Sequence, residues 1–425
     1  MSCRLLLTIA LFICGSYAFS QNRDTIFLLR PDRVFDGEQM QERWEVLVQG
    51  NKIIAAGKAG SFSVPSSAKL ILLKGQTLLP GFIEGHGHLF LHPYNEVSWK
   101  DQLLKESRAE RTIRAAQHAE ATLLAGFTTF RDLGTEGVGY EDVGLKQSIE
   151  KGLIPGPRLI IATRAIVATG SYGVKNEIAE LDLPRGAAEA DGVEGLTREV
   201  RTQIGAGADV IKVYADYRWG LNDQAMPTFT IEELKAVVEV AASSGRYVVA
   251  HASTEEGMRR AIIAGVHTIE HGTNGTPEIF RMMKEKGVAL CPTISADESI
   301  STYNGWKPGS LPEPERIIQK RKIFKQALEA GVTICAGGDV GVFTHGKNYI
   351  ELEKMVEYGM KPMEVLKAVT NGNATIFGWS GKIGVIRKDA FADLIAVPGN
   401  PAENIKVIET VKMVMKGGVV WRMEE

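Results

Sequence analysis

The sequence predicts an α/β barrel of eight parallel strands, joined to a small β-sandwich built from both ends of the chain. Two patterns predict this fold. Between residues 80 and 381, short apolar runs alternate with amphipathic helical stretches. Residues 21–79 and 382–425 instead show short alternating runs broken by Gly, Asn and Pro, as antiparallel strands do. Neither end has enough strands to bury a core alone, so we expect both ends to share one domain.

The barrel prediction depends on eight apolar runs that follow one another along the chain. No Gly-rich dinucleotide turn follows the first run, which favours a closed barrel over an open doubly wound sheet. The runs are FIEGHGH (82–88), FTTFRDLG (127–134), RLIIATRAI (158–166), DVIKVYA (209–215), YVVAHAS (247–253), HTIEHGT (267–273), VALCPTIS (288–295) and VTICAGGDV (332–340).

The first 20 residues differ from the rest of the chain. Arg4 is their only charge, and residues 5–14 form an apolar run too short to span a bilayer. Small residues follow it at Ser16, Ala18 and Ser20. We therefore predict a signal peptide over residues 1–20 and an exported protein, periplasmic or secreted, with no membrane span once the signal is removed. An uncleaved membrane anchor is the alternative.

The composition excludes some classes of protein and partner. The chain has 49 Lys and Arg against 51 Asp and Glu, so it carries no basic field that would hold nucleic acid. The expected partner is a small molecule, with a homo-oligomer as an open possibility. Beyond the signal, Cys291 and Cys335 are the remaining cysteines, and both lie in apolar runs. Two thiols do not make a disulfide framework, and the sequence leaves open whether they pair.

Polar side chains gather where the barrel runs end, at the mouth where such barrels carry their chemistry. The first run closes with two histidines at i and i+2, a spacing that puts both rings on one face of a strand. A single histidine at a strand end is usually structural, but the joint pattern over five strands predicts a metal site. The set is His86, His88, Lys212, His251, His271 and Asp339.

These motifs resemble the amidohydrolase superfamily over essentially the whole chain after the signal. The resemblance lies in PGFIEGHGH, GFTTFRDLG, GADVIKVY, VVAHAS, TIEHGT, AGGD and GKIGVIRKDAFADLIAVPGNP. The most similar branch is the imidazolonepropionase-like group that includes Xaa-Pro dipeptidases, and IKVYADYR is similar to the prolidase members.

The resemblance implies two divalent metal ions, usually zinc. It assigns His86, His88 and Asp339 to one ion and His251 and His271 to the other. Lys212, as the carbamate formed with carbon dioxide, would bridge both. A lysine whose pKa is depressed by burial can react as the neutral amine, which agrees with that role. Asp339 would take a proton from the attacking water and return it to the leaving nitrogen.

Two tyrosines are candidates for stabilising the reacting carbonyl oxygen. Many relatives carry TGGHG after the third strand, and here Tyr172 replaces that histidine. A phenol can donate a hydrogen bond to a developing oxyanion, and Tyr214, two residues after the predicted bridging lysine, can provide another. Aromatic packing at the barrel rim is the alternative for both.

Substrate recognition is predicted from three further residues. A dipeptide or N-acyl amino acid carries a carboxylate, for which a bidentate arginine is the fitting partner. Arg131 and Arg218 are the candidates, although Arg131 could instead form a structural salt bridge, for instance with Asp132. His345 could line the pocket.

The predicted function is hydrolysis of an amide or peptide bond in a small substrate, most plausibly a dipeptide such as Xaa-Pro. A lactonase, a cyclic-amide hydrolase or an esterase would use the same site and is the first alternative. A non-catalytic exported binding protein is the second.

Overall fold

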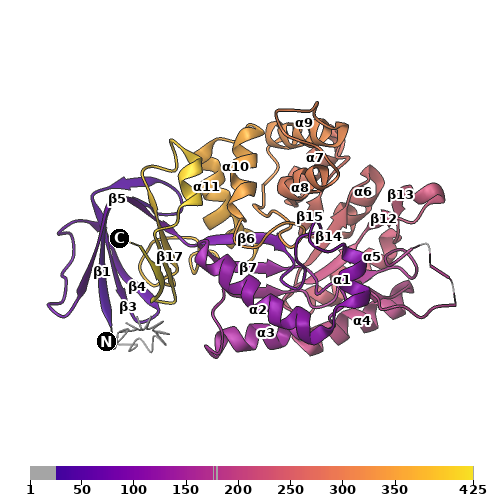
Figure 1. Cartoon of the computed structure of the whole chain (residues 1–425), viewed down its shortest axis with the longest axis horizontal. Helices are drawn as coiled ribbons and strands as arrows, with labels where there is room; N and C mark the ends of the chain where they lie inside the picture. The colour runs from indigo at the N-terminus through magenta and orange to yellow at the C-terminus, as the bar shows by residue number, and fades with distance from the viewer. Residues whose placement is uncertain (1–24, 176, 179, 425) are drawn as a thin grey trace, which may run out of the picture.

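The structure is a computed structural model that describes residues 25–175, 177–178 and 180–424. The signal peptide predicted for residues 1–20 lies outside the described residues. A small sheet stands at one end of the molecule and a barrel of strands and helices at the other (Figure 1). Within the described part of the chain, none of the helices combines the length and apolar character needed to cross a membrane.

Strands from both ends of the chain form one sheet, here called the terminal sheet, in the order β19-β18-β17-β5-β1-β3-β4 with β2 beside β1. The two ends meet where β5 pairs antiparallel with β17, for example Leu78 with Ala396. The strands are β1 Ile26–Phe35, β2 Met40–Glu42, β3 Trp44–Gln49, β4 Lys52–Lys58, β5 Lys69–Pro80, β17 Leu394–Pro398, β18 Met413–Lys416 and β19 Val419–Met423.

The terminal sheet has its own core, formed by side chains two residues apart on strands from both chain ends. They include Phe27 and Leu29 on β1 and Met413 and Met415 on β18, all buried. Both ends therefore contribute to one core, as the sequence pattern predicts. The hydrogen bonding is continuous through β5 and β17, so the predicted sandwich is built from a single eight-stranded sheet.

Seven of the eight predicted barrel runs contain regular strands. The third run divides in two at Thr163, whose φ is 59°, so that β8 pairs with β7 while β9 pairs with β11. The strands are β6 Phe82–Gly87, β7 Phe127–Asp132, β8 Arg158–Ile161, β9 Ile166–Val167, β10 Ala188–Glu189, β11 Ile211–Tyr214, β14 Val248–Ala252, β15 Thr268–His271 and β16 Ala289–Cys291, with the hairpin β12 Asp216–Arg218 and β13 Ala225–Pro227 outside the barrel.

The eighth run forms only isolated bridges, Leu290 with Ile334 and Gly87 with Val340, which connect β16 to β6. Its backbone approaches β6 so closely that a Cβ at Gly337 would lie 2.5 Å from the His86 nitrogen. This close approach and the turn that follows explain why the run is irregular, and they bring the end of the run against the first strand.

Helices alternate with the barrel strands and pack around them (Figure 1). The register of the parallel strands places Tyr214 opposite His251 and Ala252 opposite His271, so the carboxyl ends of three strands are level. The helices are α1 Trp99–Lys105, α2 Arg108–Leu124, α3 Glu141–Glu150, α4 Gly192–Ala206, α5 Ile231–Ala242, α6 Glu255–Ala264, α7 Pro277–Lys286, α8 Ile294–Tyr303, α9 Glu315–Ala330, α10 Tyr349–Glu357, α11 Pro362–Lys367 and α12 Asn373–Ile376, with short turns η1 Leu221–Asp223, η2 Ala368–Gly372 and η3 Ile405–Glu409.

Candidate metal centre and active-site cleft

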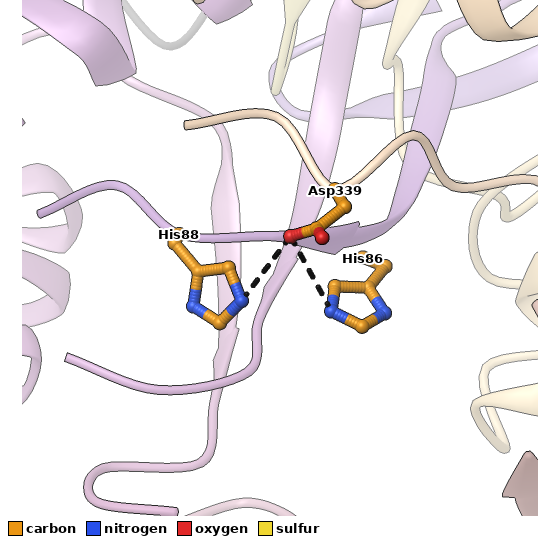
Figure 2. Close-up of side chains that lie close together, drawn as sticks. All are labelled: His86, His88 and Asp339. Carbon is orange, nitrogen blue, oxygen red and sulfur yellow. Dashed lines mark ion pairs between the residues drawn. The ribbon is translucent and has the colours of Figure 1, made fainter. Parts of the chain in front are cut away.

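Three of the predicted ligands converge at the mouth of the barrel. Figure 2 shows the rings of His86 and His88 turned toward the carboxylate of Asp339. Oδ1 of Asp339 lies 3.7 Å from Nε2 of His86 and 3.4 Å from Nε2 of His88. This oxygen is buried and has no hydrogen-bond partner among the described residues. An unsatisfied buried carboxylate oxygen between two imidazole nitrogens fits a divalent cation, because such a group is costly to bury unless something binds it.

The far side of each ring is held by an oxygen. Nδ1 of His86 donates to Oε2 of Glu270 over 2.7 Å, and Nδ1 of His88 donates to the carbonyl oxygen of Gly134 over 2.9 Å. With the ring proton on Nδ1, the lone pair of each Nε2 points toward Asp339. This is the arrangement in which a histidine binds a metal, since the second hydrogen bond fixes both tautomer and orientation.

The other two predicted histidines extend this cluster. The ring of His271 lies 5.0 Å from that of His86 and 4.6 Å from that of His251, between ring centres. Nδ1 of His271 lies 2.8 Å from the hydroxyl oxygen of Thr293, while Nε2 of His251 faces Asp216 at 3.8 Å. All four predicted histidines thus form one contiguous group.

Lys212 lies on β11 beside this group and is 1% exposed. Its Nζ stands 5.6 Å from the centre of the Tyr214 ring, and it forms no ion pair within the described part of the chain. Burial lowers the pKa of the ammonium, and the charges of Glu270 and Asp339 oppose that effect only in part. Burial thus shifts the equilibrium of this side chain toward the neutral amine, relative to an exposed lysine.

Arg131 does not reach the cleft, which corrects the prediction that it binds a substrate carboxylate. Its side chain is wholly buried, and Nη2 donates to Oε1 of Glu270 over 3.0 Å while Nε donates to the carbonyl oxygen of Gly85 over 2.6 Å. The salt bridge is structural, as the alternative proposed, but its partner is Glu270 rather than Asp132.

Sequence reasoning missed Glu270 as a functional residue. It precedes His271 in the sixth run, and its side chain links Arg131 to His86. A signal for it existed: a carboxylate inside an otherwise apolar run needs a buried cation, and Arg131 inside the second run is the matching one.

His345 is also removed from the cleft, against the prediction that it lines the pocket. It is 6% exposed, its Nε2 donates to the carbonyl oxygen of Leu91, and its ring stacks on His118 with 4.2 Å between centres. Burial lowers the pKa of His118 to about 4. This histidine pair packs behind the site.

Two more acidic residues fix the strand ends. Asp216 accepts hydrogen bonds from the backbone of Ser253 and Thr254, just after His251. Glu84 accepts from the His86 and Gly338 nitrogens and so ties the first run to the eighth. Burial raises the pKa of Glu84 to about 7. The sequence motifs contain both residues, but their partners lie in other runs.

The predicted ligands open into a cleft of 530 Å³ lined by tyrosines and by polar and charged side chains. A larger cavity of 1180 Å³ lies between α2 and α3 but contains none of the predicted metal ligands. The cleft is lined in part by Tyr94, Tyr172, Tyr214, Tyr217, Arg218 and Arg316.

The two predicted oxyanion donors differ in what their hydroxyl groups contact. Tyr172 donates its hydroxyl proton to Oε2 of Glu136 over 2.5 Å, so in this structure the proton predicted to stabilise an oxyanion is already engaged. The Tyr214 ring stacks on His251 with 4.5 Å between centres, which places it next to the ligand cluster. Arg218 lies at the exposed rim of the cleft, where it can meet a substrate carboxylate.

The two cysteines are free and buried in the structure, on neighbouring segments of the barrel. The Sγ of Cys291 lies 3.7 Å from the carbonyl oxygen of Gly337, and Nη2 of Arg131 lies 3.6 Å from the Sγ of Cys335. They pack beneath the ligand cluster as small apolar side chains.

The chain is similar to known proteins over most of its length. The model of the amidohydrolase family matches residues 77–420. Ochratoxinase from Aspergillus niger is 33% identical over 374 residues, which cover 81% of this chain and 75% of that protein. A solved Xaa-Pro dipeptidase with bound methionine in its active site is 33% identical with a TM-score of 0.82, covering 94% of this chain and 100% of that one. A solved prolidase in complex with N-methylphosphonate-L-proline is 27% identical with a TM-score of 0.80 over the same shares.

The family match extends over most of the chain, including the barrel, the predicted ligands and strands β17 and β18 of the terminal sheet. The solved structures of similar proteins share the whole architecture. The chain therefore belongs to the amidohydrolase family and is a hydrolase that acts on amide bonds.

Proposed function

We propose that this protein is a binuclear metal-dependent hydrolase that cleaves the peptide bond of a dipeptide such as Xaa-Pro. The observation that carries the proposal is the buried, unpartnered Oδ1 of Asp339, facing Nε2 of both His86 and His88. The similarity to a Xaa-Pro dipeptidase and to a prolidase supports the choice of substrate.

The residues present fit a pair of divalent cations, which we propose to be zinc. His86, His88 and Asp339 would hold one ion and His251 and His271 the other, because imidazole nitrogens and carboxylates are the ligands that zinc accepts in catalytic sites. When bound, the pair would polarise the scissile carbonyl and lower the pKa of the attacking water.

Lys212 would complete the site as a carbamate. Its neutral amine would form a bond to the carbon of carbon dioxide and release one proton, which leaves an anion with two oxygens. The burial of Lys212 and its lowered pKa favour the neutral amine that this reaction needs.

The remaining steps fall to side chains of the cleft. Asp339 would accept the proton of the attacking water on its carboxylate and deliver it to the leaving nitrogen, which an amide requires. Tyr214 would donate a hydrogen bond from its hydroxyl group to the oxygen of the scissile carbonyl, and Arg218 would bind the carboxylate of the substrate. We assign no carbonyl contact to Tyr172, because its proton is held by Glu136.

The test is the metal content of the purified protein together with its turnover of two substrate panels, Xaa-Pro dipeptides and lactones. Two zinc ions per chain and release of proline are the expected results. A protein that binds two metals but hydrolyses only lactones would overturn the peptidase assignment.

We also propose that the mature protein is exported. Amino-terminal sequencing of protein recovered outside the cytoplasm would find cleavage near Ala18 or Ser20.

A further inference from the structure

Three carboxylates that the proposed mechanism does not use line the cleft. Asp216 and Asp297 are held by partners within the protein, whereas Glu136 is only partly held. Glu136 follows β7 and is 3% exposed although it lines the cleft. Its Oε2 accepts two hydrogen bonds, one from the Tyr172 hydroxyl over 2.5 Å and one from the Trp99 indole N–H over 2.8 Å. Its Oε1 accepts none within the described part of the chain. Half of this carboxylate is thus fixed, and the other half is available to a ligand.

No cation of the described chain forms an ion pair with this carboxylate. Arg111 is close in the packing, but its guanidinium donates to the backbone carbonyl oxygens of Phe90, Thr135 and Glu136, over 3.0, 3.5 and 2.7 Å. The charge of Glu136 acts on Arg111, where it opposes the lowering of the pKa by burial, and also on the cleft. After burial, it is the largest influence that raises the pKa values of Tyr94, Tyr172 and Tyr214. A buried carboxylate that forms no ion pair and has one oxygen without a hydrogen bond favours binding of a cationic group.

The free oxygen lies near the backbone segment that holds the ring of His88. Oε1 lies 3.7 Å from the point that a Cβ on Gly134 would occupy, and the carbonyl oxygen of Gly134 is the acceptor for Nδ1 of His88. In a dipeptide, the α-nitrogen is only two bonds from the scissile carbonyl carbon. Arg218, which follows β11 and the start of the hairpin, offers the opposite charge at the rim of the same cleft.

We propose that Oε1 of Glu136 binds the α-ammonium of an unblocked dipeptide, so that the cleft selects zwitterionic dipeptides over N-acylated amino acids. This inference rests on the proposed function, because it names the substrate class of the same cleft. With Glu136 for the ammonium and Arg218 for the carboxylate, each charged end of the substrate has a partner of opposite sign.

The test compares proline release from Leu-Pro, N-acetyl-Leu-Pro and N-acetyl-Lys-Pro by the zinc-loaded wild type and by Glu136→Gln. Gln keeps the shape of the side chain and removes its charge. We expect kcat/KM for Leu-Pro to fall about 10- to 100-fold in the variant, the range of one hydrogen bond to a charged group, with most of the change in KM. The rate with N-acetyl-Leu-Pro should change little. Glu141→Gln, which removes a carboxylate on α3 outside the cleft, is the matched control and should match the wild type.

Each outcome is decisive. Equal losses on Leu-Pro and N-acetyl-Leu-Pro would overturn the inference while the dipeptidase function stands. A further outcome is that the wild type hydrolyses N-acetyl-Lys-Pro with a kcat/KM close to that for Leu-Pro and that Glu136→Gln loses this activity. That result would show that Glu136 binds a side-chain ammonium and would also overturn the inference. Failure of the wild type on all three substrates would reject the proposed function first.

A second measurement needs no variant. The α-amino group of a dipeptide loses its proton near pH 8, whereas the N-acetylated substrate has no such group. The ratio of kcat/KM for Leu-Pro to that for N-acetyl-Leu-Pro should therefore fall as the pH rises through about 8, because titrations of the enzyme common to both substrates cancel in the ratio. A ratio that stays constant from pH 6.5 to 9.5 would contradict binding of the ammonium.

Discussion

Replacing Glu270 by Gln should lower both the stability of the apoprotein and its affinity for metal, through two separable effects. The carboxylate joins Arg131, at 3.0 Å, to His86, at 2.7 Å, and all three side chains are 0–1% exposed. Removing one partner leaves the guanidinium buried and unpaired, which costs about 3–5 kcal/mol in the free energy of unfolding. His86 also loses its charged acceptor, which should lower metal affinity about 10- to 100-fold.

The two effects are measured on the same protein. Urea unfolding after treatment with a chelator gives the stability of the apoprotein, and competition with a chromophoric zinc chelator gives the affinity. The double variant Arg131→Met/Glu270→Met removes both buried charges and separates the causes. It should regain most of the lost stability, since no unpaired charge remains, but not the affinity, since Nδ1 of His86 still lacks its acceptor.

Unfolding of Glu270→Gln at the same urea concentration as the wild type, with zinc bound as tightly, would contradict both effects. A double variant as unstable as the single one would contradict the effect on stability. That result would mean that the shape of the side chain, rather than its charge, is what Arg131 requires.

Three further changes test other parts of the site. Lys212→Ala should lose most metal and activity, with partial rescue by added acetate or formate. Lys416→Ala, which removes a half-buried lysine of the terminal sheet, should keep both in a metal and turnover assay. Arg218→Met should raise KM for Leu-Pro with little change in kcat, and an unchanged KM in steady-state kinetics would remove it from the carboxylate site. Burial raises the pKa of Glu351 from 4.5 to about 7, so the folded protein binds the extra proton and stability falls as pH rises from about 4.5 to 7. Glu351→Gln should therefore gain up to about 3 kcal/mol relative to wild type between pH 5 and 7.5 in urea unfolding of the chelated protein; a difference independent of pH would contradict this.

The convergence of the predicted metal ligands can be expected from the sequence because topology alone brings these residues together. Parallel strands in a barrel end at the same rim, so His86, His251 and Asp339 meet although they are far apart in the chain. The period of the apolar runs shows which residues are strand ends. Identifying the strand ends requires no knowledge of contacts between distant segments.

The partners of the ligands are not predictable in the same way. Periodicity marks Arg131 and Glu270 as interior residues of the second and sixth runs, but it does not show that the two pair. The opposite error concerns His345, which follows Asp339 closely in sequence yet packs on His118. In both cases the direction of a side chain is set by packing between segments, which a pattern along one segment does not contain.

Backbone strain connects these contacts to the chemistry of the cleft. Among the described residues, nine that are not glycine have a positive φ, and four of them line the cleft: Glu136, His271, Thr293 and Asp339. Each such conformation costs about 1–3 kcal/mol and persists only where neighbouring contacts fix it. Those contacts are visible, since Nζ of Lys320 donates to the carbonyl oxygen of His271 over 2.9 Å and the Asp339 nitrogen donates to the His86 carbonyl oxygen over 2.8 Å. That Glu136 shares this property with two of the predicted ligands, His271 and Asp339, is independent support for a role in the cleft, because strain of this kind concentrates at functional sites.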